Sequence, residues 1–298
     1  MKKMQNIFIA GCLLAVMLLV TSCGDDFLDT QPLDKISSDA TWSDAALAEA
    51  FIFGVYSYLG YGGFEEQGLS SYTDEAMFTH AGRPIPPLNE GTESPTNLAY
   101  MSPTYNWDDM YLAIRQANIA LEELAKSPID AAAKDRLTGE AHFLRAYYYQ
   151  QLLRFFGGVP IIQQAYGLGE DYQVARNSYS DVVDFIVSDL DAATSLLDGK
   201  GETPGRASKL AALALKSRVL LYAASDLHEA SKVPNAEMGG ELFAYSGGQD
   251  GRWQAAKTAA KAALDAGTGY KLDLSAPVSA SEGRANYLAV SMGGGSAV

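Results

Sequence analysis

GEAHFLRAYYYQQLLRFFGGVPII, residues 139–162, is the stretch that decides the fold of this chain. In and just before it, apolar side chains recur at steps of three and four residues, the spacing of one face of an α-helix. They are Leu137, Ala141, Leu144, Tyr148, Leu152 and Phe155. Three consecutive tyrosines widen this apolar surface, so we expect a central helix with neighbours on more than one side. Gly157, Gly158 and Pro160 predict that the helix ends sharply.

Part of this helix is repeated later in the chain. The motif A-x3-R-x3-Y occurs twice, 73 residues apart (214 − 141 = 73), at Ala141, Arg145, Tyr149 and at Ala214, Arg218, Tyr222. We interpret both arginines as structural side chains that lie along their helices and bond loop carbonyls. Contact with a ligand is the alternative interpretation.

The helices expected before and between these motifs also resemble one another. Each places mainly apolar side chains at relative positions 0, 3, 7 and 11, counted from Trp107, Tyr179 and Trp253. Because Trp107 has the same repeat position as Tyr179 and Trp253, we favour core packing for it over contact with a ligand. Recurring helix pairs predict a mainly α fold, a tetratricopeptide-like solenoid of helical pairs with long loop insertions. The segments 163–177 and 226–251 are the expected insertions.

Composition narrows the class of protein. The chain has 298 residues, 48% of them hydrophobic, which is enough for a sizeable core. Its formal net charge of −14 argues against nucleic acid as a partner, because binding phosphates requires clustered Lys and Arg. Both cysteines, Cys12 and Cys23, lie near the N-terminus. The remainder of the chain therefore has no disulfide and no cysteine metal site.

Residues 1–22 are predicted to be a lipoprotein signal peptide. Lys2 and Lys3 precede an apolar run over residues 7–20, which is too short to span a membrane. The sequence VTSC at residues 20–23 resembles a bacterial lipobox, in which Cys23 is lipidated. Attachment of more than one acyl chain holds a protein stably at a membrane. A plain signal peptide with an incidental cysteine is the alternative.

The mature chain is expected to have three parts. Residues 23–40 form an extended tether, and residues 41–276 form the helical-repeat domain. Within that domain, the segment 61–106 is rich in Gly, Pro, Ser, Thr and Asn and shows no helical period. A loop of that length inside a compact domain is usually functional or disordered. Residues 277–298 begin an incomplete C-terminal part, so we expect the chain to be truncated.

Three segments together resemble the SusD/RagB family. They are CGDDFLDTQP at 23–32, AHFLRAYYYQQLLRFFGGVPII at 141–162 and GRASKLAALALKSRVLLYAAS at 205–225. The resemblance implies a helical core with a loop-rich ligand face, in a lipoprotein exposed at the cell surface on the outer membrane. It also implies glycan binding and delivery of oligosaccharides to a SusC-like TonB-dependent transporter. Family members are longer than this chain, and part of their glycan site comes from the later half.

The loop 61–106 resembles the family's ligand loop and contains the residue types that sugars require. A sugar ring stacks its C–H face on a flat aromatic side chain, and its hydroxyls pair with Asn, Asp, Arg or Gln. We therefore predict glycan contacts from Tyr72, Asp74, Arg83, Asn97 and Tyr100. The alternative is that these side chains only pack the loop onto the helices.

Paired carboxylates are the strongest argument for an enzyme. Glycoside hydrolysis requires two carboxyl groups about 5–10 Å apart. Neighbouring acidic residues occur at Glu65/Glu66, Glu90/Glu93 and Asp108/Asp109. In so acidic a chain we interpret these pairs as solvated surface.

Metal and cofactor motifs are absent from the sequence. The histidines, His80, His142 and His228, are too far apart for a helical metal site, and no P-loop, dinucleotide or nucleophile-elbow motif occurs. The sequence therefore predicts a non-enzymatic glycan-binding protein with neither metal nor cofactor. Two alternatives stay open: a helical-repeat protein–protein scaffold at the outer membrane without glycan affinity, and a surface glycoside hydrolase.

Overall fold

The computed structural model describes residues 38–59, 74, 91, 107–167, 169–200, 203–233 and 240–267. The chain divides into two units, residues 1–41 and residues 42–298, and the helices from α3 onward belong to the second. The α-helices in the described ranges are α2 (Ser38–Ser43), α3 (Ala45–Tyr56), α5 (Trp107–Lys126), α6 (Ala131–Phe156), α7 (Tyr179–Leu196), α8 (Lys209–Ala224) and α9 (Gln249–Ala266). Short 3₁₀ turns are η2 (Ser57–Leu59), η5 (Asp226–His228) and η6 (Gly240–Leu242).

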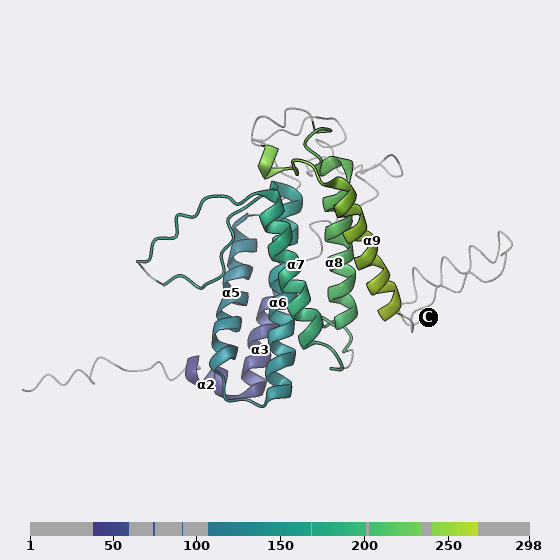
Figure 1. The fold of residues 1–298 in the computed structure, drawn as a ribbon. Helices are drawn as coiled ribbons and strands as arrows, with labels where there is room; N and C mark the ends of the chain where they lie inside the picture. Colours follow the sequence, from purple (N-terminus) through teal and green to yellow (C-terminus); the bar gives the residue numbers. More distant parts are fainter. Residues whose placement is uncertain are drawn as a thin grey trace, which may run out of the picture. The chain divides into compact units, whose positions relative to one another are not determined.

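Consecutive helices pack against one another. In Figure 1, α5 to α9 lie side by side, each in contact with the next, and α3 packs against α5 and α6. The short connection of residues 127–130 makes α5 and α6 antiparallel neighbours. The predicted mainly α fold of tetratricopeptide-like helical pairs is confirmed. No helix in the described ranges is long and apolar enough to cross a membrane.

Helix α6 is the centre of this arrangement, as its sequence predicted. The side chains of Leu137, Ala141, Leu144, Tyr148 and Leu152 are fully buried, and Phe155 is half-buried. Helices α3 and α5 contact α6, and so do α7 and α8. The helix ends at Phe156, where Gly157 takes a φ of 73° that an L side chain rarely adopts.

The second copy of A-x3-R-x3-Y does not occupy an equivalent environment. Ala141, Arg145 and Tyr149 are buried, whereas Ala214 and Arg218 are exposed and Tyr222 is 53% exposed. Within the described residues Arg218 forms no hydrogen bond to a loop carbonyl, so they do not support the role that the sequence predicted for it.

The partner helix explains this difference. Helix α7 supplies Asp189 to Arg145 and Phe185 to Tyr149. On α9, the motif's own offset of 73 residues, counted from Asp189, leads to Ala262 (189 + 73 = 262). Arg218 thus has no matching carboxylate on the next helix.

Helix α9 also differs from the expected pattern at its tryptophan. Trp253 is 42% exposed, although its repeat position predicted core packing. The helix instead buries Ala256 and Ala259. The buried face of α9, which packs on α8, is therefore not the face that contains Trp253. The predicted repeat positions are wrong for this helix. Trp107 of α5 is half-buried against Phe156, their ring centroids 5.2 Å apart.

Candidate functional site

Most of the predicted site residues lie outside the described residues. These are Tyr72, Arg83, Asn97 and Tyr100, together with Cys23. Asp74 is described by itself, as an exposed turn residue. The roles of these five residues stay predictions. The described residues that form a candidate site follow the loop in the sequence, from Trp107 onward.

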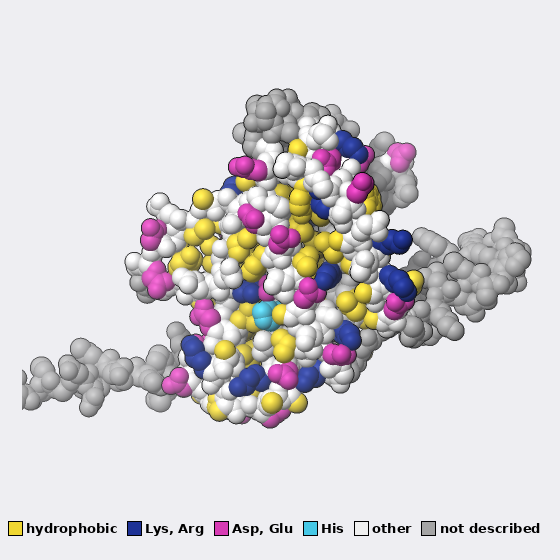
Figure 2. All heavy atoms as spheres, in the orientation of Figure 1, with side chains coloured by type: hydrophobic (Ala, Val, Ile, Leu, Met, Phe, Trp, Pro, Cys, Tyr) yellow, Lys and Arg dark blue, Asp and Glu magenta, His cyan; other side chains and the backbone are white. Residues whose placement is uncertain are grey.

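A groove of about 720 Å³ opens between α5 and the segment that connects α6 to α7. We call it the α5 groove. Its size falls within the range of about 300–1,000 Å³ typical of small-molecule sites. It is lined by Trp107, Tyr111, Arg115, Pro160, Ile162, Gln164, Tyr166, Gly167, Tyr172, Gln173 and Val174. In Figure 1 the segment with the later of these residues projects beside α5, and in Figure 2 hydrophobic side chains gather on it.

The wall on α5 results from helical spacing. Trp107, Tyr111 and Arg115 lie four residues apart, so their side chains share one face of the helix. The rings of Trp107 and Tyr111 lie 5.0 Å apart, between centroids. The predicted ligand loop 61–106 ends one residue before Trp107. This wall therefore begins where that loop ends.

The opposite wall is held in place by side chains of α5 and α6. They bond its backbone at several points, which fixes residues 160–166 without regular secondary structure. The bonds are Tyr111 Oη to Pro160 O at 2.7 Å, Ile162 N to Tyr149 Oη at 2.6 Å, Asn118 Nδ2 to Ile162 O at 3.0 Å, Ala165 N to Glu122 Oε1 at 2.8 Å and Arg115 Nη1 to Tyr166 O at 2.6 Å.

A buried charged cluster orients the Asn118 amide. The guanidinium of Arg145 donates to both carboxylate oxygens of Asp189 at 2.7 Å and to Asn118 Oδ1 at 2.8 Å. His142 Nδ1 also lies 2.7 Å from Asp189. Burial favours a higher pKa for Asp189, but its bonds to Arg145 and His142 outweigh burial and hold that pKa below the ordinary value. The amide nitrogen of Asn118 is thereby turned toward the wall of the groove.

This cluster corrects the interpretation of Arg145. Its role is structural, as the sequence indicated, but it bonds side chains of neighbouring helices rather than loop carbonyls. Arg115 of α5, by contrast, does bond a loop carbonyl, that of Tyr166. Sequence reasoning missed Arg115, Tyr166 and Tyr172, and it ranked Trp107 as core. The spacing of Trp107, Tyr111 and Arg115 is the signal that was available in the sequence.

The described polar side chains of the groove can form hydrogen bonds with a ligand. Among the described residues that line it, Arg115 carries the charge, Gln164 and Gln173 carry amides, and none is a carboxylate. Asp108 and Asp109 of α5 are not part of the lining, while the Glu65/Glu66 and Glu90/Glu93 pairs lie outside the described residues. Within the part of the chain that the structure describes, no group of three or more His, Cys, Asp or Glu side chains could hold a metal ion.

Comparison with known proteins identifies the family. Residues 26–221 match the family model of SusD-like proteins, described as starch-binding and associating with the outer membrane. The chain belongs to the SusD-like family. The resemblance of its three segments to SusD/RagB proteins is thereby confirmed.

SusD-like relatives are similar in sequence and in fold, but longer. A SusD-like protein of Formosa agariphila is 26% identical over 227 residues, which cover 74% of this chain and 43% of the relative. A SusD-like protein of Bacteroides ovatus is 27% identical over 239 residues, which cover 73% of this chain and 40% of the relative. The chain spans about two fifths of the length of these relatives.

Two solved structures of SusD-like proteins share the fold. One, from Bacteroides fragilis, is 31% identical with a TM-score of 0.51, covering 65% of this chain and 38% of that one. The other, a SusD homolog from Bacteroides thetaiotaomicron, is 22% identical with a TM-score of 0.57. The match covers 77% of this chain and 42% of the homolog. At that lower identity the likeness concerns the fold alone.

Proposed function

We propose that this SusD-like chain binds carbohydrate in the α5 groove and does not cleave it. The observation that carries the proposal is the groove's lining, in which four aromatic side chains stand beside two amides and one guanidinium. The family model, described as starch-binding, supports the same ligand class. Aromatic rings accept the C–H face of a sugar, and amides replace the water that its hydroxyls lose.

The aromatic side chains divide into fixed and exposed ones. Trp107 and Tyr111 are anchored by ring contacts and by the bond from Tyr111 to Pro160. Tyr172 is 74% exposed, so a bound sugar ring would cover apolar surface that now faces water. We propose that Tyr72, Asp74, Arg83, Asn97 and Tyr100 of the preceding loop add contacts to the same ligand.

The family also suggests where binding takes place and where the bound sugar goes next. We propose that Cys23 is lipidated and anchors the protein at the surface of the outer membrane. There it delivers oligosaccharides to a SusC-like TonB-dependent transporter. The description of the family model as associating with the outer membrane supports this location.

Replacing Tyr172 by alanine tests the binding site. We expect about a tenfold weaker affinity, because loss of one aromatic contact costs about 0.5–1.5 kcal/mol in addition to the lost apolar burial. Native gels containing one polysaccharide each, from a panel of neutral and acidic polymers, identify a ligand through retarded migration. Calorimetry with its oligosaccharides then gives the affinity.

Trp253→Ala is the matched control, since Trp253 is also an exposed aromatic side chain but lies on α9 and outside the groove. The control should bind like the unchanged protein. Equal affinity of the Tyr172 variant and the unchanged protein would refute the assignment of the groove. Release of reducing sugar would favour a hydrolase. Capture of the transporter, with no retardation by any polysaccharide, would favour a protein scaffold.

A further inference from the structure

A second pocket lies at the ends of three helices, and it shares no lining residue with the α5 groove. It has a volume of about 380 Å³ and lies where α6 and α8 end and α7 begins, next to η5. We call it the His228 pocket. Its lining residues are Gln150, Leu153, Arg154, Tyr179, Val219, Tyr222, Leu227 and His228.

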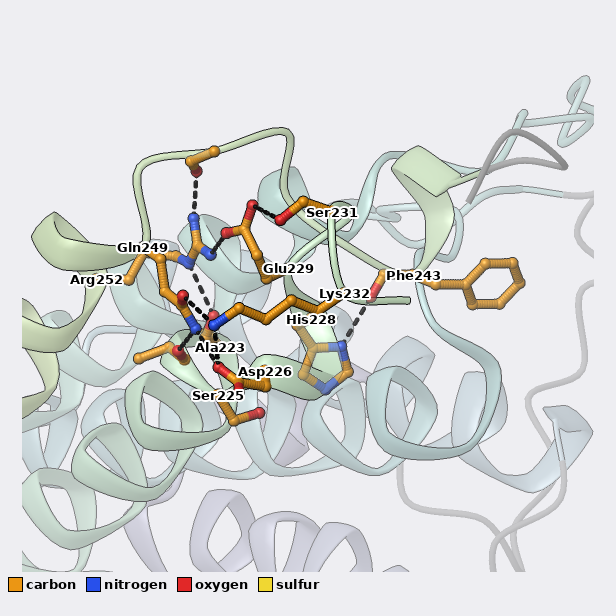
Figure 3. A network of polar contacts seen from close by, with 12 residues as sticks. Ala223, Ser225, Asp226, His228, Glu229, Ser231, Lys232, Phe243, Gln249 and Arg252 are labelled. Atoms are coloured by element: carbon orange, nitrogen blue, oxygen red, sulfur yellow. Dashed lines mark hydrogen bonds and ion pairs between the residues drawn. The ribbon is translucent and has the colours of Figure 1, made fainter. Parts of the chain in front are cut away.

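The imidazole of His228 is held in one orientation, and its surroundings favour the neutral form. Its ring stacks on Tyr179, with centroids 4.2 Å apart, and its Nδ1 lies 2.7 Å from the carbonyl oxygen of Phe243 (Figure 3). A carbonyl only accepts, so Nδ1 carries the proton. Burial lowers the pKa of His228, which favours the neutral ring. Nε2 is then left as a hydrogen-bond acceptor.

The turn that carries His228 is fixed by a network of polar contacts. Figure 3 shows Arg252 of α9 between the end of α8 and Glu229. Arg252 donates to Ala223 O at 2.9 Å and to Glu229 Oε2 at 2.6 Å. Lys232 and Gln249 bind the carboxylate of Asp226 at 2.7 and 2.8 Å. The wall formed by His228 is therefore in place before any ligand arrives.

Gln150 and Arg154 supply hydrogen-bond donors to the pocket. Gln150 is only 7% exposed, and its Oε1 accepts from Gln151 Nε2 at 2.6 Å. Its amide nitrogen is then the group that can donate into the pocket. Arg154 lies over the ring of Phe155, 4.8 Å from the centroid, and forms no ion pair with any carboxylate of the described residues.

We propose that the His228 pocket binds a uronic-acid residue of an acidic glycan. The guanidinium of Arg154 matches a carboxylate, with which it can form two parallel hydrogen bonds. Tyr222 offers a flat face for the ring, while Gln150 and His228 offer a donor and an acceptor for its hydroxyls. None of the described residues that line the pocket carries a carboxylate, although the chain has a net charge of −14, so an anionic sugar meets no like charge from them.

This inference rests on the proposed function only for the carbohydrate nature of the ligand. The described lining residues of the α5 groove and of the His228 pocket are different, so either binding proposal can be refuted without affecting the other. Loss of neutral-glycan binding in Tyr172→Ala tests the groove, and loss of uronate binding in an Arg154 variant tests the pocket.

The probe is sodium glucuronate, with glucose as its neutral counterpart, titrated into the protein and monitored by NMR. We expect glucuronate to perturb the ring signals of His228 and Tyr222 and glucose to bind at least tenfold more weakly. Arg154→Gln should weaken glucuronate binding about tenfold or more, because the charge-assisted hydrogen bonds to the carboxylate are lost. Arg154→Lys should retain part of the affinity, since the charge remains but the paired geometry is lost.

Lys257→Gln is the control, because it removes the same charge from an exposed position on α9 that lines neither site. It should leave glucuronate binding unchanged. The proposal is overturned if glucose and glucuronate bind equally or if Lys257→Gln weakens binding as much as Arg154→Gln. It is also overturned if an N-acetylated tripeptide with a free carboxylate occupies the pocket and glucuronate does not.

Discussion

Replacing Arg145 by methionine should lower the free energy of unfolding by about 3–5 kcal/mol, the usual cost of removing one partner of a buried ion pair. Asp189 is 4% exposed and would lose both bonds from the guanidinium. Its remaining polar partner among the described residues would be His142. Asn118 would also lose the bond to its carbonyl oxygen that holds it beside the groove wall. Urea unfolding monitored by circular dichroism measures the loss.

The chain supplies its own control, since Arg218 has the same place in the sequence motif but is exposed. Arg218→Met should change the stability by less than about 0.5 kcal/mol. Adding Asp189→Leu to Arg145→Met should restore much of the loss, because an apolar pair of similar volume leaves no buried charge unpaired. Similar losses in the Arg145 and Arg218 variants would contradict the account of the buried cluster.

Gly158→Ala should be nearly as damaging, with a loss of about 3 kcal/mol, at the upper end of the range for added atoms in a packed site. A Cβ at this position would overlap the carbonyl oxygen of Asn177 and lie 2.9 Å from the carbonyl carbon of Ser178. Both neighbours are backbone atoms, and Asn177 donates to Val159 O at 3.2 Å. Ser178 caps α7 through its bond from Asp181 N. The added methyl group therefore forces the start of α7 away from the end of α6.

The matched variant is Gly54→Ala in α3, where a Cβ would meet nothing within 4 Å. It should raise the stability by about 0.5–1 kcal/mol, because alanine favours a helix interior more than glycine does. Thermal unfolding of the two variants should shift in opposite directions. A shift of both in the same direction would show that the close approach at Gly158 is misdescribed.

These two experiments bear on what the sequence could predict. The fold was predictable because the apolar side chains of α6, three consecutive tyrosines among them, face more than one side of the helix and so require neighbours on several sides. The environment of the second motif was not predictable from the motif itself. Burial of Arg145 depends on Asp189, and alanine stands at the corresponding place on α9. Comparing the partner helices as well as the motifs would have predicted an exposed Arg218.

The α5 groove was only partly predictable, for a different physical reason. Its helical wall has a regular spacing, visible in Trp107, Tyr111 and Arg115. Its other wall contains Tyr166 and Tyr172, in a segment without helical or strand periodicity. The path of that segment depends on bonds to distant side chains, such as that from Asn118 to Ile162 O. A sequence pattern does not report bonds of this kind.

A crystal structure of the chain with the oligosaccharide identified in the gel screen tests the central claim most directly. We predict a sugar ring in the α5 groove, stacked on Tyr172 or Tyr111, with its hydroxyls bonded to Gln164, Gln173 or Arg115, and with every glycosidic bond intact. An oligosaccharide bound elsewhere while the groove holds only water, or one found cleaved, would contradict the claim.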